Sequence, residues 1–256
     1  MRQKLSWRNL LLVGFTLFSM FFGAGNLIFP PFLGAEAGTL TWHAMRGFLL
    51  SAVGLPVLGV AAVAMAGGLD RLGRRVHPGF AFVFTLLIYL SIGPCLAIPR
   101  TASTSFEMAV LPYLGGLGTA LGSRAQLIYS VVFFCIAMAL AFRPDKLTDR
   151  LGKGLCPTLL ILIAVIFTGC LIWPLGAYGA PAKEYADSAA VKGFLEGYQT
   201  MDTIAALNFG IIIALNIRAK GVQEDGAVVR ETVKAGVIAG LLMAAVYVAL
   251  AHIGAP

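Results

Sequence analysis

The stretch LLLVGFTLFSMFFGAGNLIFPPFL occupies residues 10–33 and contains no acidic or basic side chain. Its 24 residues are enough to cross the hydrocarbon core of a bilayer, and they exceed the roughly 7–15 apolar residues of a signal-peptide core. Within it, Gly23-Ala24-Gly25-Asn26 and the pair Pro30-Pro31 both weaken a helix. The stretch therefore predicts a first membrane span that is interrupted near its middle.

The composition of the whole chain agrees with a membrane protein. Of its 256 residues, 59% are hydrophobic and only 12% are charged, and the mean hydropathy is +0.86. Too little polar surface is available to cover a soluble globule. The net charge of +7 comes from basic residues in short clusters between apolar runs. That pattern is typical of cytoplasmic membrane loops, so we expect no nucleic-acid partner.

Seven apolar runs, each close to the length of a membrane-spanning helix, follow one another along the chain. They cover residues 10–33, 41–66, 79–103, 124–142, 154–178, 197–217 and 232–253. Because backbone polar groups in lipid need partners within the segment, these runs are predicted to be helices. Residues 1–256 are thus predicted to form one polytopic, all-α integral membrane domain.

The distribution of Lys and Arg predicts the orientation of these spans. Fourteen of the 19 basic residues lie before the first run, in the loops after the second and fourth runs, or between the end of the sixth run and Lys234, near the start of the seventh. Cytoplasmic loops carry such an excess, so the N-terminus is predicted to be cytoplasmic. An odd number of spans would place residue 256 outside, directly after a span, and we expect the chain to be an incomplete fragment.

The interruption in the first run suggests a binding site. If the helix breaks at Gly23 to Asn26 and restarts near Leu27, free N–H groups and the positive end of a half-helix face the middle of the membrane, where an anion can bind. Pro30 and Pro31 then fall in or next to the first turn, where they cost little. The alternative is a closely packed helix face that uses small residues.

A second irregularity lies in the sixth run, where the segment GYQTMDT occupies residues 197–203. Asp202 is the only acidic residue that we place well inside a span. A charge at the bilayer centre costs about 2.5–3.5 kcal/mol, so a partner or a water-filled cavity is expected. The alternative is that Asp202 lies near the outer end of its helix and reaches solvent. Paired breaks in the first and sixth runs indicate a transporter site between two repeats.

Three separated motifs resemble the branched-chain amino acid:cation symporter family. They are GAGNLIFPP at 23–31, Gly93-Pro94 with PRTA at 99–102, and GYQTMD at 197–202. The resemblance implies uptake of leucine, isoleucine and valine into a bacterial cell across its inner membrane, by alternating access and driven by Na⁺ or H⁺. It also implies the leucine-transporter fold of inverted five-helix repeats. Residues 10–178 would form the first repeat, and residues 197–256 would form the start of an incomplete second repeat.

The same resemblance implies roles for individual residues. The unwound segment that meets the substrate carboxylate would be Gly23, Ala24, Gly25 and Asn26. Asp202 and Thr203 would lie near the substrate ammonium group and the ion. The candidate ion ligands would be Asn26, Thr203 and the backbone carbonyls of Ser19, Phe21 and Phe22.

A membrane-embedded enzyme and a channel are the two alternatives to a symporter. A membrane-embedded enzyme would need an acid–base constellation inside the bilayer. The three histidines, His43, His77 and His252, lie at span ends or in loops, so we expect neither a catalytic residue nor a cofactor, and no metal other than a possible Na⁺. A channel would show rings of pore-lining groups. The expected partners are the amino acid, the coupling cation and the bilayer; the sequence predicts no oligomeric state.

Overall fold

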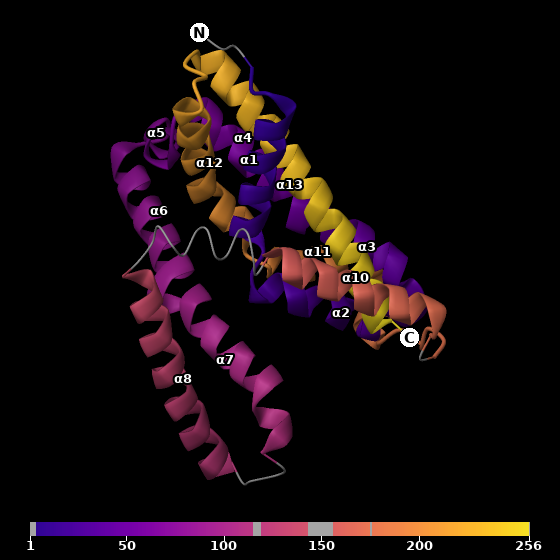
Figure 1. Ribbon diagram of the computed structural model, residues 1–256. Helices are drawn as coiled ribbons and strands as arrows, with labels where there is room; N and C mark the ends of the chain where they lie inside the picture. The colour runs from indigo at the N-terminus through magenta and orange to yellow at the C-terminus, as the bar shows by residue number, and fades with distance from the viewer. Residues whose placement is uncertain (1–3, 115–118, 143–155, 175, 256) are drawn as a thin grey trace. The chain divides into compact units, whose positions relative to one another are not determined.

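The computed structural model describes residues 4–114, 119–142, 156–174 and 176–255, and every regular element of these ranges is helical (Figure 1). The α-helices are α1 (Trp7–Phe21), α2 (Ala24–Ala37), α3 (Thr41–Leu49), α4 (Leu55–Ala66), α5 (Leu69–Arg74), α6 (Pro78–Leu90), α7 (Ala97–Ala109), α8 (Thr119–Ala141), α10 (Cys156–Ile172), α11 (Lys183–Tyr198), α12 (Asp202–Ala219) and α13 (Asp225–Gly254). Two single turns are 3₁₀-helical, Gly38–Leu40 and Leu111–Tyr113, and two are π-helical, Leu50–Gly54 and Ser91–Cys95.

The chain forms two compact units. The first consists of Met1–Thr85 and Thr158–Pro256, and the second of Leu86–Pro157. In the second unit, α7 and α8 lie side by side (Figure 1). Tyr129 of α8 packs its ring against Phe106 of α7, with the ring centroids 5.5 Å apart, and its hydroxyl donates a hydrogen bond to Ser105 Oγ at 3.1 Å.

Five described helical stretches are long and apolar enough to cross a membrane: Ala24–Ala66, Pro78–Tyr113, Gly122–Ala141, Asp202–Ala219 and Asp225–Gly254. Two shorter apolar helices are Trp7–Phe21 and Pro157–Ile172. Many large apolar side chains on these helices are exposed, among them Leu58 and Leu241. An exposed apolar surface of this extent suits lipid and not water, so the chain is a multi-pass membrane protein, while the count of seven spans stays a prediction.

The first predicted span is divided into two helices. Helix α1 ends at Phe21, and α2 begins at Ala24. The interruption lies where the glycines predicted it, but the restart is three residues earlier than the expected Leu27. Pro30 and Pro31 therefore stand at the seventh and eighth positions of α2 and not in its first turn. Their missing N–H groups deprive the carbonyls of Asn26 and Leu27 of helical donors.

Small residues allow α11 to pack closely on α3. Gly193 and Gly197 form a GxxxG pattern on α11, a spacing that lets helix backbones approach each other. A Cβ on Gly193 would lie 2.0 Å from the carbonyl oxygen of Ala44, and one on Gly47 would lie 1.8 Å from that of Ala190. The backbones touch here, so α11 is part of the packed core of the first unit.

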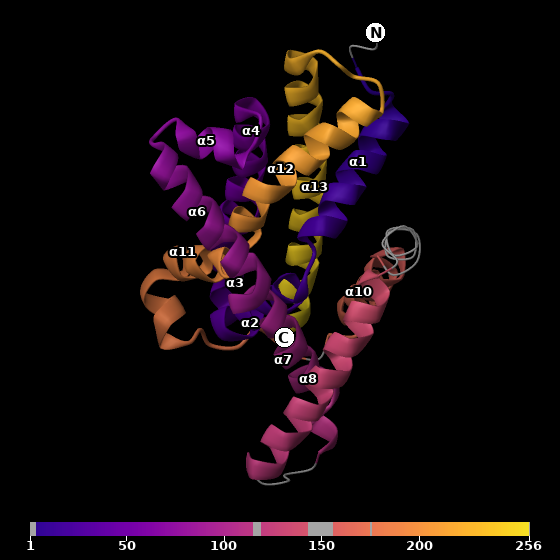
Figure 2. The ribbon, with the colours of Figure 1, turned by 90° about the vertical axis from the view of Figure 1, so that its left-hand side faces the viewer.

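Helix α13 is the long central helix of the first unit, and α1, α2, α4 and α12 all contact it (Figures 1 and 2). A second GxxxG pattern, Gly236 and Gly240, faces α4 and the turn before it. A Cβ on Gly240 would meet Val57 at 2.9 Å and Val53 at 3.0 Å. The helix is 30 residues long and begins seven residues before the predicted run 232–253.

A π-helical turn joins α3 to α4. The turn covers Leu50–Gly54, and Ser51 within it is buried. Ser51 Oγ donates to the carbonyl of Phe194 on α11 at 2.7 Å, while the carbonyl of Ser51 accepts from Thr203 Oγ1 on α12 at 3.4 Å. π-Helical turns are frequent at functional sites, and this one contacts both helices that flank the second interruption.

Candidate functional site

The break between α1 and α2 exposes two helix ends to the same space. The last turn of α1 has carbonyls without intrahelical donors, and the first turn of α2 has N–H groups without intrahelical acceptors. Asn26 closes part of this gap, because its Oδ1 accepts the Gly23 N–H at 2.8 Å. Gly23 itself is exposed. The break therefore offers a negative and a positive helix end within a few residues.

The break between α11 and α12 has the same character. Helix α11 ends at Tyr198, α12 begins at Asp202, and Met201 takes a left-handed conformation with φ of 67°. A positive φ is uncommon for a residue with a side chain, and it turns the chain sharply before α12. Asp202 is consequently the first residue of α12, where a carboxylate interacts favourably with the helix dipole.

The two breaks are joined by three buried side chains, which we call the central cluster: Asn26, Asp202 and Tyr247. Asn26 Nδ2 donates to Asp202 Oδ2 at 2.7 Å and also to the Tyr247 hydroxyl. The Tyr247 hydroxyl donates to Asp202 Oδ2 at 2.9 Å. Exposed fractions are 1% for Asn26, 3% for Asp202 and 0% for Tyr247. The alternative in which Asp202 reaches solvent does not describe this structure.

Aromatic rings lie against the central cluster and at the first break. Phe48 of α3 meets Tyr247 edge to face, with ring centroids 5.3 Å apart. Phe21 at the end of α1 lies 5.5 Å from Phe209 of α12, measured between ring centroids. Hydrogen bonds in such apolar surroundings are electrostatically stronger than in water, and a polar group left unpaired there is costly. Any ligand of the cluster must therefore replace the hydrogen bonds that it displaces.

The remaining residues predicted for the site lie at varying distances from the cluster. Thr203 directs its hydroxyl to the Ser51 carbonyl rather than to the cluster. Ser19 Oγ is bonded to the Phe15 carbonyl at 3.0 Å, within its own helix. Phe21 is the last residue of α1 and Phe22 is its C-cap, so their carbonyls lie at the break, and their role as ion ligands stays a prediction. Ala24 and Gly25 form the first turn of α2 with Asn26.

Sequence reasoning missed Tyr247. It lies within the apolar segment LLMAAVYVAL at 241–250, and tyrosine in membrane proteins is more common at the interfaces than at the centre. A phenol in the middle of such a run needs a hydrogen-bond partner. That need was the available signal, but it does not say which partner, because Asn26 and Asp202 lie on other helices.

The arrangement of groups is suited to binding a small zwitterion. N–H groups at the start of α2 can donate hydrogen bonds to a carboxylate, and carbonyls at the end of α1 can ligand a cation. Asp202 supplies a negative charge close by. Among the described residues, no group of three or more His, Cys, Asp or Glu side chains is placed to hold a metal ion.

Comparison with known proteins identifies relatives along the whole chain. Residues 6–256 match the family described as branched-chain amino acid transport protein. The chain is 42% identical to the branched-chain amino acid permease BraB of Bacillus subtilis (strain 168), over 100% of this chain and 57% of that protein. It is 42% identical to the branched-chain amino acid transport system 3 carrier protein of Pseudomonas aeruginosa, over 99% of this chain and 57% of that protein.

The branched-chain amino acid permease BrnQ of Escherichia coli (strain K12) is 39% identical, over 99% of this chain and 57% of that protein. The chain thus spans somewhat more than half the length of these relatives. No solved structure matches it. Since the family match extends over nearly all of its residues, the chain belongs to the branched-chain amino acid transport family.

Proposed function

We propose that the protein carries leucine, isoleucine and valine into a bacterial cell together with Na⁺ or H⁺, by alternating access around the central cluster. The observation that carries the proposal is the junction of two broken helices through Asn26, Asp202 and Tyr247. The relatives are named as permeases and carriers of branched-chain amino acids. The polar groups needed to hold a zwitterion are concentrated at that junction.

Electrostatics gives a reason for coupling the substrate to a cation. A helix N-terminus stabilises a carboxylate by about 0.3–1 kcal/mol, and by about 2 kcal/mol when partly buried. Burying the carboxylate costs several times more. A cation held by the carbonyls at the end of α1 would offset the difference if it bound next to the carboxylate. We therefore expect substrate and cation to bind together, with the ammonium group directed to Asp202.

An inverted repeat is supported by the way helices pair in the first unit. Helix α1 packs along α13, and α11 packs along α3; after each break, α2 contacts α13 and α12 contacts α4. If α1 and α2 correspond to α11 and α12, and the α3–α4 span corresponds to α13, then the contacts of α1 and α2 with α13 match those of α11 with α3 and of α12 with α4. This is the relation expected between repeats of the leucine-transporter fold, with Trp7–Ala37 and Pro157–Ile172 contributing to seven spans in total.

The proposed orientation places the N-terminus in the cytoplasm. The start of α1, helix α5 and the α12–α13 loop lie at one end of the first unit (Figures 1 and 2). These segments carry Arg8, then Arg71, Arg74 and Arg75, then Arg218 and Lys220. Basic residues gathered at one end of a helical membrane unit mark its cytoplasmic side. The turn between α2 and α3 and the start of α11 would then face outward.

Transport by the protein can be tested after its reconstitution into proteoliposomes. Proteoliposomes preloaded with unlabelled leucine should accumulate labelled leucine by counterflow, and an imposed Na⁺ or H⁺ gradient should drive concentrative uptake. Isoleucine and valine should compete, and glutamate should not. If leucine equilibrates across the membrane but no cation gradient drives its accumulation, the result would contradict symport and indicate a channel or a facilitator.

A further inference from the structure

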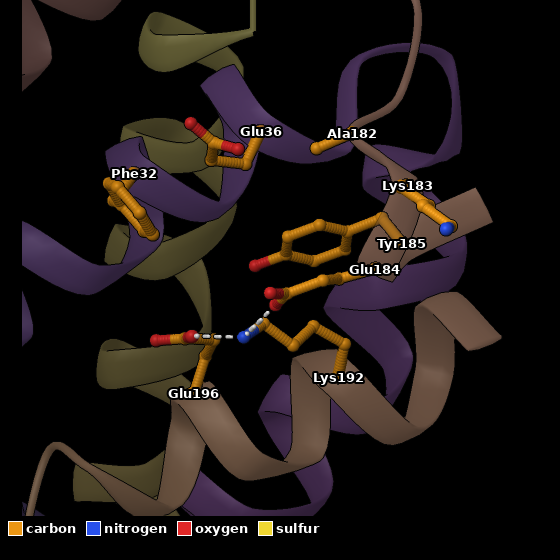
Figure 3. A pocket seen from close by; sticks show the side chains of 8 residues that line it. All are labelled: Phe32, Glu36, Ala182, Lys183, Glu184, Tyr185, Lys192 and Glu196. Carbon is orange, nitrogen blue, oxygen red and sulfur yellow. Dashed lines mark ion pairs between the residues drawn. The ribbon is translucent and has the colours of Figure 1, made fainter. Parts of the chain in front are cut away.

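A pocket lies between the end of α2 and α11 (Figure 3). Its volume is about 490 Å³. The residues that line it are Phe32, Glu36, Ala182, Lys183, Glu184, Tyr185, Lys192 and Glu196. We call it the α2–α11 pocket. It shares no residue with the central cluster, and a backbone hydrogen bond from the Ala182 N–H to the Glu36 carbonyl at 2.8 Å joins its two walls.

The Tyr185 hydroxyl is the unusual group of this pocket. The side chain is 1% exposed, and its hydroxyl oxygen has no hydrogen-bond partner among the described residues. Figure 3 shows the hydroxyl directed into the pocket, on the side where the carboxylates of Glu36, Glu184 and Glu196 lie. Burial, together with the charges of Glu196, Glu36 and Glu184, raises the pKa of the Tyr185 phenol, so it stays neutral. A buried polar group without a partner requires an explanation, and a bound ligand provides one.

The charges of the pocket are only partly compensated. Lys192 Nζ pairs with Glu184 at 2.5 Å and with the buried Glu196 at 3.3 Å. Glu36 and Lys183 have no ion-pair partner among the described residues. Three carboxylates and two ammonium groups leave the pocket with one uncompensated negative charge. The pocket is therefore prepared for a cationic group.

The acceptors fit an organic ammonium better than a metal ion. A primary ammonium carries three N–H donors and no acceptor, and the walls of the pocket supply acceptors from Glu36, Glu196 and the Tyr185 oxygen. Among the described residues, no three His, Cys, Asp or Glu side chains are placed to hold one metal ion. Phe32 adds an apolar wall, and Lys183 also lines the pocket, with its ammonium group directed away from the three carboxylates (Figure 3).

We propose that the α2–α11 pocket is a second amino-acid site, in which Glu36, Tyr185 and Glu196 hold the ammonium group of an apolar amino acid at the outer mouth of the carrier. This inference rests on the proposed function, because an amino acid is the natural occupant only of an amino-acid carrier. The site would concentrate substrate next to the helices whose breaks form the central cluster.

Binding of labelled leucine to the purified chain in lipid nanodiscs tests the site. Asn26→Leu provides a background in which the central cluster is disabled. In that background leucine should still bind, and Glu36→Gln or Tyr185→Phe should weaken the remaining binding by about tenfold or more, because each removes a hydrogen bond to a charged group. Leucinol, which keeps the ammonium group, should compete, and N-acetylleucine should not.

Asp187→Asn is the matched control, since Asp187 is exposed on α11, the helix that carries Tyr185, and does not line the pocket. It should leave the residual binding unchanged. Tyr185→Phe should also leave thermal unfolding unchanged, because it removes only a hydroxyl without a partner. If the unmodified chain binds leucine but no Asn26→Leu variant does, the proposal of a second site in the pocket is overturned and the proposed function is not. Absence of leucine binding by the unmodified chain overturns the pocket and counts against the proposed function as well.

Discussion

Asp202 shows how one residue is defined by its position at a helix start. Its carboxylate is at the first position of α12, and Oδ2 accepts hydrogen bonds from Asn26 and Tyr247. Asp202→Asn keeps the shape of the side chain and removes its charge. We expect the protein to fold and the affinity for leucine or for the coupling cation to fall about 10- to 150-fold, the loss of about 1.5–3 kcal/mol from a charge-assisted bond.

Counterflow at graded leucine and cation concentrations measures this loss. Asp187→Asn, the same chemical change at an exposed position, should change either affinity by less than about twofold. Asn26→Leu should be at least as damaging as Asp202→Asn, since it also removes the acceptor of the Gly23 N–H. A normal Asp202→Asn beside a damaged Asn26→Leu would leave the first break in the site and remove Asp202 from it.

Tyr247 is coupled to both of its neighbours in the cluster. Tyr247→Phe removes a hydroxyl that donates to Asp202 and accepts from Asn26. In a double-mutant cycle of Tyr247→Phe with Asp202→Asn, the effects on leucine affinity should not add, and the interaction energy should be about 0.5–3 kcal/mol. Additive effects would show that the two side chains act on the substrate independently.

The sequence indicated two members of the cluster and not the third. Asn26 and Asp202 were recognisable because an amide directly after two closely spaced glycines and an acid inside an apolar run are both expensive in a membrane. Tyr247 satisfies its hydroxyl through partners 45 and 221 residues away. Only the fold brings such partners together, so the pattern around Tyr247 in its own helix could not reveal them.

At the scale of elements, close approach of α3 and α11 depends on residues without side chains. Gly47→Ala places a methyl group 1.8 Å from the Ala190 carbonyl oxygen, which backbone atoms cannot easily avoid. We expect the free energy of unfolding to fall by about 1–3 kcal/mol or more. Thermal unfolding of the purified protein in nanodiscs measures the change.

Gly169 on α10 supplies the control of opposite sign. Nothing lies within 4 Å of a Cβ added there. Gly169→Ala should leave stability unchanged or raise it by up to about 1 kcal/mol, since alanine is the better helix former. If both substitutions behaved alike, the tight contact between α3 and α11 would not exist in solution.

Element boundaries followed the sequence where the signal was local. The span predicted at 41–66 coincides with the first and last residues of α3 and α4, and the interruption at Gly23 is where two glycines placed it. The start of α12 was predicted five residues too early, at 197. Nothing in the local sequence marks Met201 as left-handed, whereas the helices on either side of it pack on α3 and α4, which are far away in the sequence.

At the scale of the whole molecule, the orientation is open to a direct labelling experiment. In a cysteine-free variant, Ser188→Cys should react with an impermeant thiol reagent in intact cells, because residue 188 is exposed on the predicted outer side. Val76→Cys, also exposed, lies in the basic segment after α5 and should react only after the cells are opened. The reverse pattern would overturn the predicted orientation.

The π-helical turn Leu50–Gly54 shifts the helical register between the two halves of its span, α3 and α4. Before it, Gly47 meets Ala190 of α11; after it, a Cβ on Gly59 would lie 3.1 Å from that of Ala206 on α12. A residue deleted from the turn would rotate α4 by about 100° relative to α3. The two halves of the span thus pack on their partners in separate registers. Converting the π-helical turn into regular α-helix would misalign either α3 with α11 or α4 with α12, even though both halves remained helical.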